Sequence, residues 1–230
     1  DSNASRGLGD VYKRQRHKEE LSEPLIACYE SLIEVGDAQV ANANLLDVIR
    51  KVQCFGMGLV KLDIRQESDR HAEAIDAVTR FVGLGSYLEW SEEKKIEWLT
   101  SELENKRPLL PTDLECSAEV KEVLDTCKMI ARLQQTCPGS LGTYVISMAT
   151  CASDVLAVVL LQRECGCRRE DLLRVAPLFE RLDDLNDAPR VWRQLFSVSW
   201  YREHIAGSQE IMIGYSDSGK DAGRMAAAWA

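Results

Sequence analysis

The chain contains the stretch Thr143-Tyr-Val-Ile-Ser-Met148, in which bulky apolar side chains dominate a short run. A run of this kind suits a buried β-strand better than a helix. Three more runs have the same texture: Gly58-Leu-Val-Lys-Leu-Asp-Ile64, Leu173-Arg-Val-Ala-Pro-Leu-Phe179 and Glu210-Ile-Met-Ile-Gly-Tyr215. Because polar residues and then a helical pattern follow each run, the sequence predicts parallel βαβ units and an α/β fold that is predominantly α-helical.

Helical periodicity fills the rest of the chain. We expect helices over 24–35, 45–55, 68–83, 92–103, 117–135, from 153 onward and over 189–206. Ser68, Ser91 and Ser117 are predicted N-caps, because a serine hydroxyl can accept a hydrogen bond from the first helical turn. Residues 1–16 lack apolar periodicity, so we expect a disordered or non-native leader before one partial domain over 17–230.

Composition excludes several classes of protein. The chain has 230 residues, with 28 Lys+Arg against 37 Asp+Glu, a formal charge of −9, and 45% hydrophobic residues. Its basic residues are scattered, so we expect no nucleic-acid partner. It has no apolar stretch of the ~20 residues that span a bilayer and no secretory signal, so we expect a cytoplasmic protein without a membrane partner.

The eight cysteines do not form a disulfide or metal-binding pattern. Cys165 and Cys167 are separated by one residue, which is neither a zinc-ribbon nor a redox spacing. Five cysteines lie in apolar runs, where a thiol behaves as a small hydrophobic group: Cys28, Cys54, Cys127, Cys151 and Cys165. We therefore expect reduced, buried thiols without a chemical role.

Charged and polar residues follow each predicted strand. In a parallel α/β fold the carboxyl ends of the strands face the ligand, so these residues are the candidates for a site. They are Asp63, Arg65, Gln66, Glu67, Ser147, Ser153, Asp154, Glu180, Asp217, Lys220 and Asp221. Two carboxylates with an arginine and a lysine suit a divalent cation and an anionic substrate. The residues alone therefore indicate an α/β enzyme of phosphorylated or carboxylated small molecules.

The stretch Tyr215-Ser-Asp-Ser-Gly-Lys-Asp-Ala-Gly223 looks like a phosphate loop, with Gly219 and Lys220 expected to precede a helix. It is not a Walker A motif. Gly214 stands five residues before Gly219, as that motif requires, but Asp221 replaces the Ser or Thr that should follow the lysine. The P-loop NTPase interpretation therefore fails.

Five segments together resemble phosphoenolpyruvate carboxylase, in the order and at the spacing of that family. They are Lys61-Leu-Asp-Ile-Arg-Gln-Glu-Ser68, Ile146-Ser-Met-Ala-Thr150, Ser153-Asp-Val-Leu-Ala-Val158, Pro177-Leu-Phe-Glu180 and Gly214-Tyr-Ser-Asp-Ser-Gly-Lys-Asp-Ala-Gly223. The likeness covers roughly 19–230 and is closer to the plant and algal type than to the bacterial one. It is much more specific than any single motif.

The resemblance implies part of a TIM-like (β/α)8 barrel with extra helices, of which this chain holds about half the strands. It implies a homotetramer that joins bicarbonate to phosphoenolpyruvate, giving oxaloacetate and phosphate, with Mg²⁺ or Mn²⁺. Glu180 and Asp217 match the family's metal ligands, Arg65 matches a catalytic residue that holds the phosphate, and Lys220 matches a residue that helps to place bicarbonate. We expect the fragment alone to be inactive.

Some features depart from the family pattern. The catalytic histidine and the Gly/Arg-rich loop of the family lie outside this span, and His17, His71 and His204 do not occur in a matching context. Cys151-Ala152 stands where relatives commonly have Ala-Pro, and Val159 where they commonly have an acid. Two alternatives stay open, namely another metal-dependent barrel lyase or phosphotransferase acting on a small phosphorylated acid, and a non-catalytic helical scaffold.

Overall fold

A computed structural model describes residues 18–230, so the expected leader and His17 lie outside the described residues. Helices predominate, and four short strands form one parallel sheet. The chain divides into two compact units, which we describe separately. Unit 1 holds the described residues up to Lys61 together with Gln135–Ser140, and unit 2 holds Leu62–Gln134 and Leu141–Ala230.

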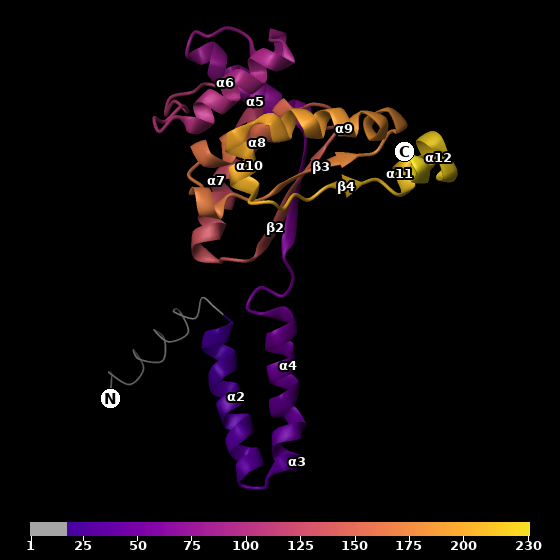
Figure 1. Cartoon of the computed structure of the whole chain (residues 1–230). Coiled ribbons are helices and arrows are strands. Elements are labelled where there is room, and N and C mark those ends of the chain that lie inside the picture. The colour runs from indigo at the N-terminus through magenta and orange to yellow at the C-terminus, as the bar shows by residue number, and fades with distance from the viewer. Residues whose placement is uncertain (1–17) are drawn as a thin grey trace. The chain divides into compact units, whose positions relative to one another are not determined.

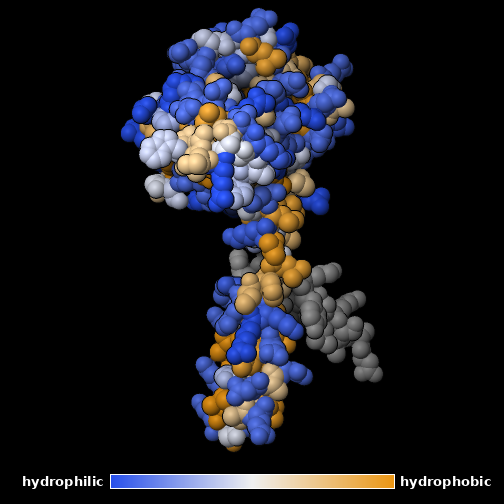
Figure 2. Space-filling model, turned by 90° about the vertical axis from the view of Figure 1, so that its right-hand side faces the viewer, coloured by the Kyte–Doolittle hydropathy of each residue, from blue (hydrophilic) through white to orange (hydrophobic). Residues whose placement is uncertain are grey.

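Unit 1 is a helical hairpin (Figure 1). Its elements are α2 (Glu19–Glu34), α3 (Ala38–Val40), the π-helical segment η1 (Ala41–Leu45) and α4 (Leu46–Phe55). The hydroxyl of Tyr29 donates to the Asn42 side-chain oxygen at 2.9 Å and joins the two arms. Three of its apolar residues are buried: Ala41, Ile49 and Val52. The hairpin therefore has a narrow core, and Figure 2 shows hydrophobic residues on its surface.

The cysteine prediction is confirmed only in part. All eight thiols are free, as expected, but Cys28 and Cys54 are exposed rather than buried. They lie on α2 and α4, where two helices alone cannot cover an apolar face completely. Cys127 is buried, whereas Cys151 and Cys165 are partly exposed.

The sheet of unit 2 confirms the four predicted strands and their parallel pairing, and the strand order is β1-β2-β3-β4. The strands are β1 (Leu62–Glu67), β2 (Leu141–Ser147), β3 (Val175–Phe179) and β4 (Met212–Ile213). The prediction for β1 started too early, because Gly58, Leu59 and Val60 are exposed and Leu59 has a φ of 62°. Pairing with β2 instead carries the strand through polar residues to Glu67, which is opposite Ser147.

The remaining elements of unit 2 are helices that follow the strands in the chain. They are α5 (Ser68–Phe81), η2 (Tyr87–Glu89), α6 (Glu92–Glu104), α7 (Ala118–Thr136), α8 (Ala152–Glu164), η3 (Arg169–Asp171), α9 (Leu182–Ser197), α10 (Ser199–Ile205), α11 (Ser216–Ala222) and α12 (Arg224–Trp229). The division into units assigns the last residues of α7 to unit 1.

Two of the three predicted N-caps are confirmed. The Ser91 hydroxyl accepts from the Lys94 N–H at 3.4 Å, and the Ser117 hydroxyl accepts from the Val120 N–H at 3.3 Å. The prediction for Ser68 was wrong. Strand β1 runs directly into α5, and the Ser68 hydroxyl donates to the Met148 carbonyl at 2.8 Å.

The helix predicted to start at Pro189 begins seven residues earlier, at Leu182. Its start is fixed by Asp184, whose carboxylate accepts from the Arg181 N–H at 3.1 Å. Pro189 therefore lies inside α9, although a proline cannot donate the usual intrahelical hydrogen bond. Val198 separates α9 from α10, so the predicted single helix is two.

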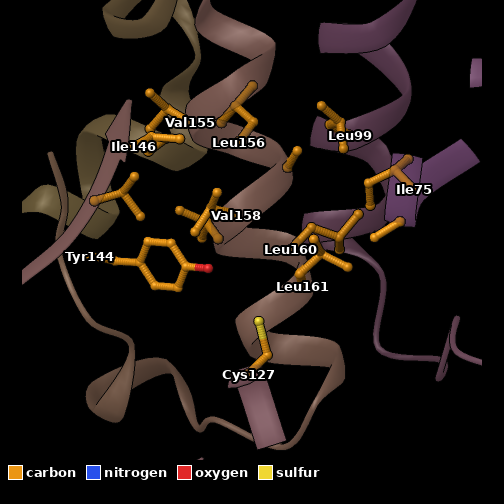
Figure 3. Close-up of a cluster of buried hydrophobic side chains, with 14 of the residues drawn as sticks. Ile75, Leu99, Cys127, Tyr144, Ile146, Val155, Leu156, Val158, Leu160 and Leu161 are labelled. Atoms are coloured by element: carbon orange, nitrogen blue, oxygen red, sulfur yellow. The ribbon is translucent and has the colours of Figure 1, made fainter. Parts of the chain in front are cut away.

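The core of unit 2 surrounds α8, which is buried along most of its length. Figure 3 shows Tyr144 and Ile146 of β2 facing Val155 and Val158 of α8, with Leu99 and Ile75 on the opposite side of that helix. Burying each large aliphatic side chain contributes about 1.5–3 kcal/mol, so this cluster dominates the stability of the unit. The fold is thus a mixed α/β body with helices packed on its parallel sheet.

Hydrophilic residues cover most of the face of unit 2 seen in Figure 2, with smaller hydrophobic groups between them. None of the helices over 18–230 combines the length and apolar character that crossing a bilayer requires.

Candidate functional site

Arg65 and Glu180 meet at the carboxyl end of the sheet. Arg65 lies in β1, and Glu180 directly follows β3. A guanidinium nitrogen of Arg65 is 3.3 Å from Glu180 Oε1, and the two side chains are 57% and 20% exposed. The structure therefore brings together a cation and a carboxylate that are 115 residues apart in the chain. Both groups are open to solvent, so a ligand can reach them.

Asp217 and Lys220 form a second pair on α11. Lys220 Nζ is 3.4 Å from Asp217 Oδ1, and both side chains are more than half exposed. This arrangement differs from the predicted phosphate loop, because Gly219 and Lys220 lie inside α11 and do not precede a helix. The stretch after Tyr215 turns straight into a helix, so Gly219 and Lys220 do not form a loop that wraps around a phosphate.

Three contacts fasten α11 to the segment that carries Glu180. The buried Ser218 hydroxyl donates to the Glu180 carbonyl at 2.6 Å. Asp221 accepts from the Leu182 N–H at 2.9 Å, and the Gly214 N–H donates to the Phe179 carbonyl at 2.9 Å. These bonds place the segment with Glu180 beside the helix with Asp217.

Gly214 marks the closest approach of these two segments. A Cβ on Gly214 would lie 3.1 Å from Glu180 Cγ, 3.2 Å from Glu180 Cα and 3.1 Å from Ser218 Oγ. A methyl group at this position requires Glu180 and Ser218 to shift by a few tenths of an ångström. The glycine is therefore needed for contact rather than for an unusual φ angle.

The turn after β2 completes this edge of the sheet. Met148 has a φ of 57°, a left-handed conformation that is uncommon for a side chain of this kind, and the Ser68 hydroxyl binds its carbonyl. Asp154 accepts from the N–H groups of Thr150 at 2.9 Å and Cys151 at 3.0 Å. Burial raises the pKa of Asp154, although these two bonds act in the opposite direction.

Some predicted site residues make structural hydrogen bonds instead of facing the open edge of the sheet. Ser153 donates its hydroxyl and its N–H to Glu92, at 2.6 and 3.0 Å, so Ser153 and Asp154 belong to the start of α8. Asp63 lies near the amino end of β1, where it accepts from the Thr143 N–H at 2.8 Å. Gln66 is bound by a buried tyrosine. Only part of the predicted set therefore lies at the open edge.

The donor set at this edge fits a hard divalent cation only together with other ligands. No three His, Cys, Asp or Glu side chains within 18–230 gather as a metal site. Magnesium, however, is commonly held by one or two carboxylates, with water and substrate oxygens completing the shell. Glu180 and Asp217 are the two carboxylates to consider at this edge, and the hydroxyl of Ser218, next to Asp217, binds the Glu180 carbonyl.

Sequence reasoning missed the residues that support these side chains. Ser218 and Gly214 lie inside the stretch that carries Asp217, and their roles depend on contact with Glu180, more than 30 residues away. The periodicity of a single segment contains no signal for such a contact. A small residue directly after a short strand is the one hint that the sequence offers.

Comparisons with known proteins agree with the resemblance. A family model described as Phosphoenolpyruvate carboxylase matches residues 5–230. Phosphoenolpyruvate carboxylase 2 of Arabidopsis thaliana is 59% identical over 207 residues, which are 90% of this chain and 21% of the relative. The C4 phosphoenolpyruvate carboxylase of Flaveria trinervia is 58% identical over 211 residues, 92% of this chain and 21% of the relative.

An algal relative matches to a similar degree. Phosphoenolpyruvate carboxylase 2 of Chlamydomonas reinhardtii is 57% identical over 231 residues, covering 93% of this chain and 19% of the relative. The chain thus spans about a fifth of the length of the curated relatives it matches. Any activity concerns the longer protein of which these residues form a part.

Proposed function

The chain belongs to the phosphoenolpyruvate carboxylase family, and from this premise we propose that the intact protein joins bicarbonate to phosphoenolpyruvate. The products are oxaloacetate and inorganic phosphate. The observation that carries the proposal is the family match over 5–230. The arrangement of Arg65, Glu180, Asp217 and Lys220 at one edge of the sheet supports it chemically.

In this proposal Arg65 binds the phosphate group. Its guanidinium is more than half exposed and already pairs with the Glu180 carboxylate. When an anion binds, Arg65 therefore exchanges one negative partner for another. Arginine forks onto two phosphate oxygens and stabilises the charge that develops while bicarbonate attacks the phosphoryl group. The pyruvate enolate that leaves then takes up CO₂ from carboxyphosphate. Lys220 helps to place bicarbonate.

Glu180 and Asp217 are the proposed ligands of a divalent cation, Mg²⁺ or Mn²⁺. Such a cation supplies Lewis-acid stabilisation of negative charge on oxygen. The chain's own part is to hold the segments that carry the two carboxylates beside each other, through the Ser218 hydroxyl and the close approach of Gly214. Asp221, bound to the Leu182 N–H, holds the far side of the same segment.

We propose the same family architecture for the whole protein. The parallel order of β1 to β4, with helices following each strand, is compatible with about half of a (β/α)8 barrel. On this interpretation the described residues form a partial barrel domain. A homotetramer in the cytoplasm, without nucleic-acid or membrane partners, completes the proposal.

The test uses the intact protein, with this chain extended at both ends to full length. Oxaloacetate is measured from phosphoenolpyruvate and labelled bicarbonate in the presence of Mg²⁺, and Mn²⁺ binding is followed separately by electron paramagnetic resonance. The variants are Asp217→Asn and Glu180→Gln. The matched control is Asp187→Asn, which removes a carboxylate that is paired with Arg190 on α9 and lies outside the proposed site.

We expect the intact protein to form oxaloacetate. Each site variant should lower the rate by on the order of 10³-fold and weaken Mn²⁺ binding, while Asp187→Asn does neither. A well-folded intact protein that forms no oxaloacetate would overturn the proposed function and favour another metal-dependent lyase or a scaffold. Full activity in both site variants would instead overturn the assignment of the metal ligands.

A further inference from the structure

A network of buried polar side chains lies behind the strand that carries Arg65. Tyr144 of β2 and His71 of α5 are both 0% exposed. The Tyr144 hydroxyl is 2.8 Å from His71 Nε2 and 2.6 Å from Gln66 Oε1. Figure 3 shows the Tyr144 ring extending from β2 into the core, with its hydroxyl oxygen at the inner end. The core thus contains a polar connection that joins β1, β2 and α5.

The hydrogen bonds in this network run in one direction. Tyr144 has a single hydroxyl hydrogen and donates it to Gln66; in this arrangement His71 donates its Nε2–H to the Tyr144 oxygen. Burial lowers the pKa of His71 to about 4, while backbone groups of Glu67 and Ser68 raise it less. The ring is therefore neutral near pH 7 and carries its one proton on Nε2.

This arrangement leaves one group unsatisfied. His71 Nδ1 is buried and has no hydrogen-bond partner in the described part of the chain. A buried polar atom without a partner destabilises a fold, and an apolar residue in place of His71 would avoid the penalty. A histidine that carries this energetic cost makes sense when the orientation of the Tyr144 hydroxyl matters for function.

Strand β1 needs support at this point. Within 18–230 it pairs with β2 alone, and the register of that pairing shifts between Leu62 and Ile64. Side-chain contacts secure its carboxyl end. Tyr144 holds Gln66, and Ser68 holds the Met148 carbonyl at 2.8 Å. Successive side chains on a strand alternate between its faces, so fixing Gln66 on the inner face fixes Arg65 on the other.

We infer that Tyr144, oriented by His71, is a positioning residue for Arg65. Its hydroxyl holds Gln66, and Gln66 fixes the backbone from which Arg65 reaches the ligand. Arg65 must keep its guanidinium within hydrogen-bonding distance of the transferred phosphoryl group, where a displacement of an ångström is costly. This inference rests on the proposed function, because it assigns the network to the same site.

The experiment is a double-mutant cycle in the intact protein. Tyr144→Phe removes only the hydroxyl, and it is made both in the native background and in Arg65→Lys. We expect kcat/KM for phosphoenolpyruvate to fall on the order of tenfold in the native background. In Arg65→Lys the same change should have an effect of less than about twofold, because a positioning residue has no effect once its target is altered.

Tyr201→Phe is the matched control. Tyr201 is also buried, at 1% exposed, and its hydroxyl donates to Gln209 Oε1 at 2.7 Å. Gln209 binds the Val175 carbonyl at the amino end of β3, away from the proposed site. Loss of this Tyr–Gln bond should lower the melting temperature as Tyr144→Phe does, while leaving kcat/KM unchanged. The comparison separates positioning from general stability.

Two further variants approach the network from its other members. Gln66→Met removes the acceptor and keeps the length of the side chain, and it should reproduce the Tyr144→Phe cycle. His71→Gln retains a donor at the place of Nε2, whereas His71→Leu does not. We therefore expect the glutamine variant to keep a kcat/KM near the native value and the leucine variant to lose it.

Each outcome bears on one claim. If Tyr144→Phe and Arg65→Lys have independent, multiplicative effects, or if Tyr144→Phe leaves kcat/KM unchanged, the inference is overturned while the proposed function stands. The same holds if both Tyr144→Phe and Gln66→Met fail to fold, since the network would then be purely structural. If the native intact protein forms no oxaloacetate, the proposed function itself fails.

Discussion

Two arginine–glutamate pairs lie at opposite edges of the same four-stranded sheet. At the amino edge Arg174 is 2.5 Å from Glu210, and Glu210 also accepts from the Thr143 hydroxyl. At the carboxyl edge Arg65 is 3.3 Å from Glu180. All four side chains are at least partly exposed, so burial alone does not distinguish the two pairs.

The difference lies in what the pairs are tied to. Glu210 connects Arg174, which precedes β3, with Thr143 of β2, and the Thr143 N–H reaches Asp63 of β1. The amino edge is thus a continuous seam across the strands. At the carboxyl edge the longer ion pair faces solvent, where an incoming ion can replace either partner. The same residue types fasten the strands at one edge of the sheet and, in our proposal, bind ligands at the other.

The largest effect should come from removing the two arginines in turn. Arg65→Gln should lower kcat/KM of the intact protein by on the order of 10³-fold or more, because an arginine that stabilises phosphoryl charge contributes at least that much. Arg174→Gln should leave kcat/KM within about twofold. Steady-state kinetics on both variants checks the contrast, and similar losses in the two would contradict it.

The second test concerns the spacing of the carboxyl edge. Gly214→Ala requires Glu180 to shift by a few tenths of an ångström, so we expect activity to fall about tenfold with little loss of folding. Gly219→Ala is the matched control. A Cβ there meets nothing within 4 Å, and alanine is the better helix former inside α11. If both substitutions leave the rate unchanged, the close approach at Gly214 has no part in catalysis.

A third test uses pH and addresses the core between the two edges. Because the pKa of His71 is lowered from 6.5 to about 4, the unfolded chain binds more protons than the folded one between these values. The free energy of unfolding is therefore highest above pH 6.5 and decreases as the pH falls toward 4. From pH 7 to pH 5 it should decrease by about 2 kcal/mol.

Thermal unfolding of the intact protein at both pH values measures this change. His71→Gln provides the reference, because glutamine does not titrate and every other group is retained. The native protein should lose more stability than the variant over this range. Identical pH dependence in the two proteins would show that His71 is not held neutral by the fold.

The smallest effect should come from Glu210→Gln. Its side chain is 47% exposed, and exposed ion pairs contribute less than about 1 kcal/mol. We expect a small drop in melting temperature and unchanged kinetics, in contrast to Glu180→Gln. Loss of activity in this variant would show that the amino edge influences the reaction and would remove the distinction between the edges.

The sequence was sufficient for the elements whose pattern is local. Strands β2 and β3 were predicted because they are short apolar runs that are buried in the structure. Strand β1 was misplaced because residues 58–60 precede the pairing with β2, and the last three paired residues, Arg65, Gln66 and Glu67, are polar. Pro189 suggested a helix start, but the bond of Asp184 to the Arg181 N–H sets the true one.

The candidate site divides in the same way. Residue types and family resemblance marked Arg65, Glu180, Asp217 and Lys220, and in the structure Arg65 pairs with Glu180 and Lys220 pairs with Asp217. Their roles stay predictions. The partner of each side chain could not be predicted, because the contact between Arg65 and Glu180 depends on how β1 and β3 flank β2. Neither that geometry nor the contact of Gly214 is encoded in a local pattern.

The hydrogen bond from Ser218 to the Glu180 carbonyl also fixes an order in time. The ribosome makes β1 before the other strands, and Glu180 is added 115 residues after Arg65. Glu180 in turn precedes the serine that secures it by 38 residues. Segment by segment, the carboxyl edge is therefore among the last parts of the described chain to become complete during synthesis. Until α11 has left the ribosome, the nascent sheet lacks the hydrogen bond from Ser218 that holds the Glu180 segment in place.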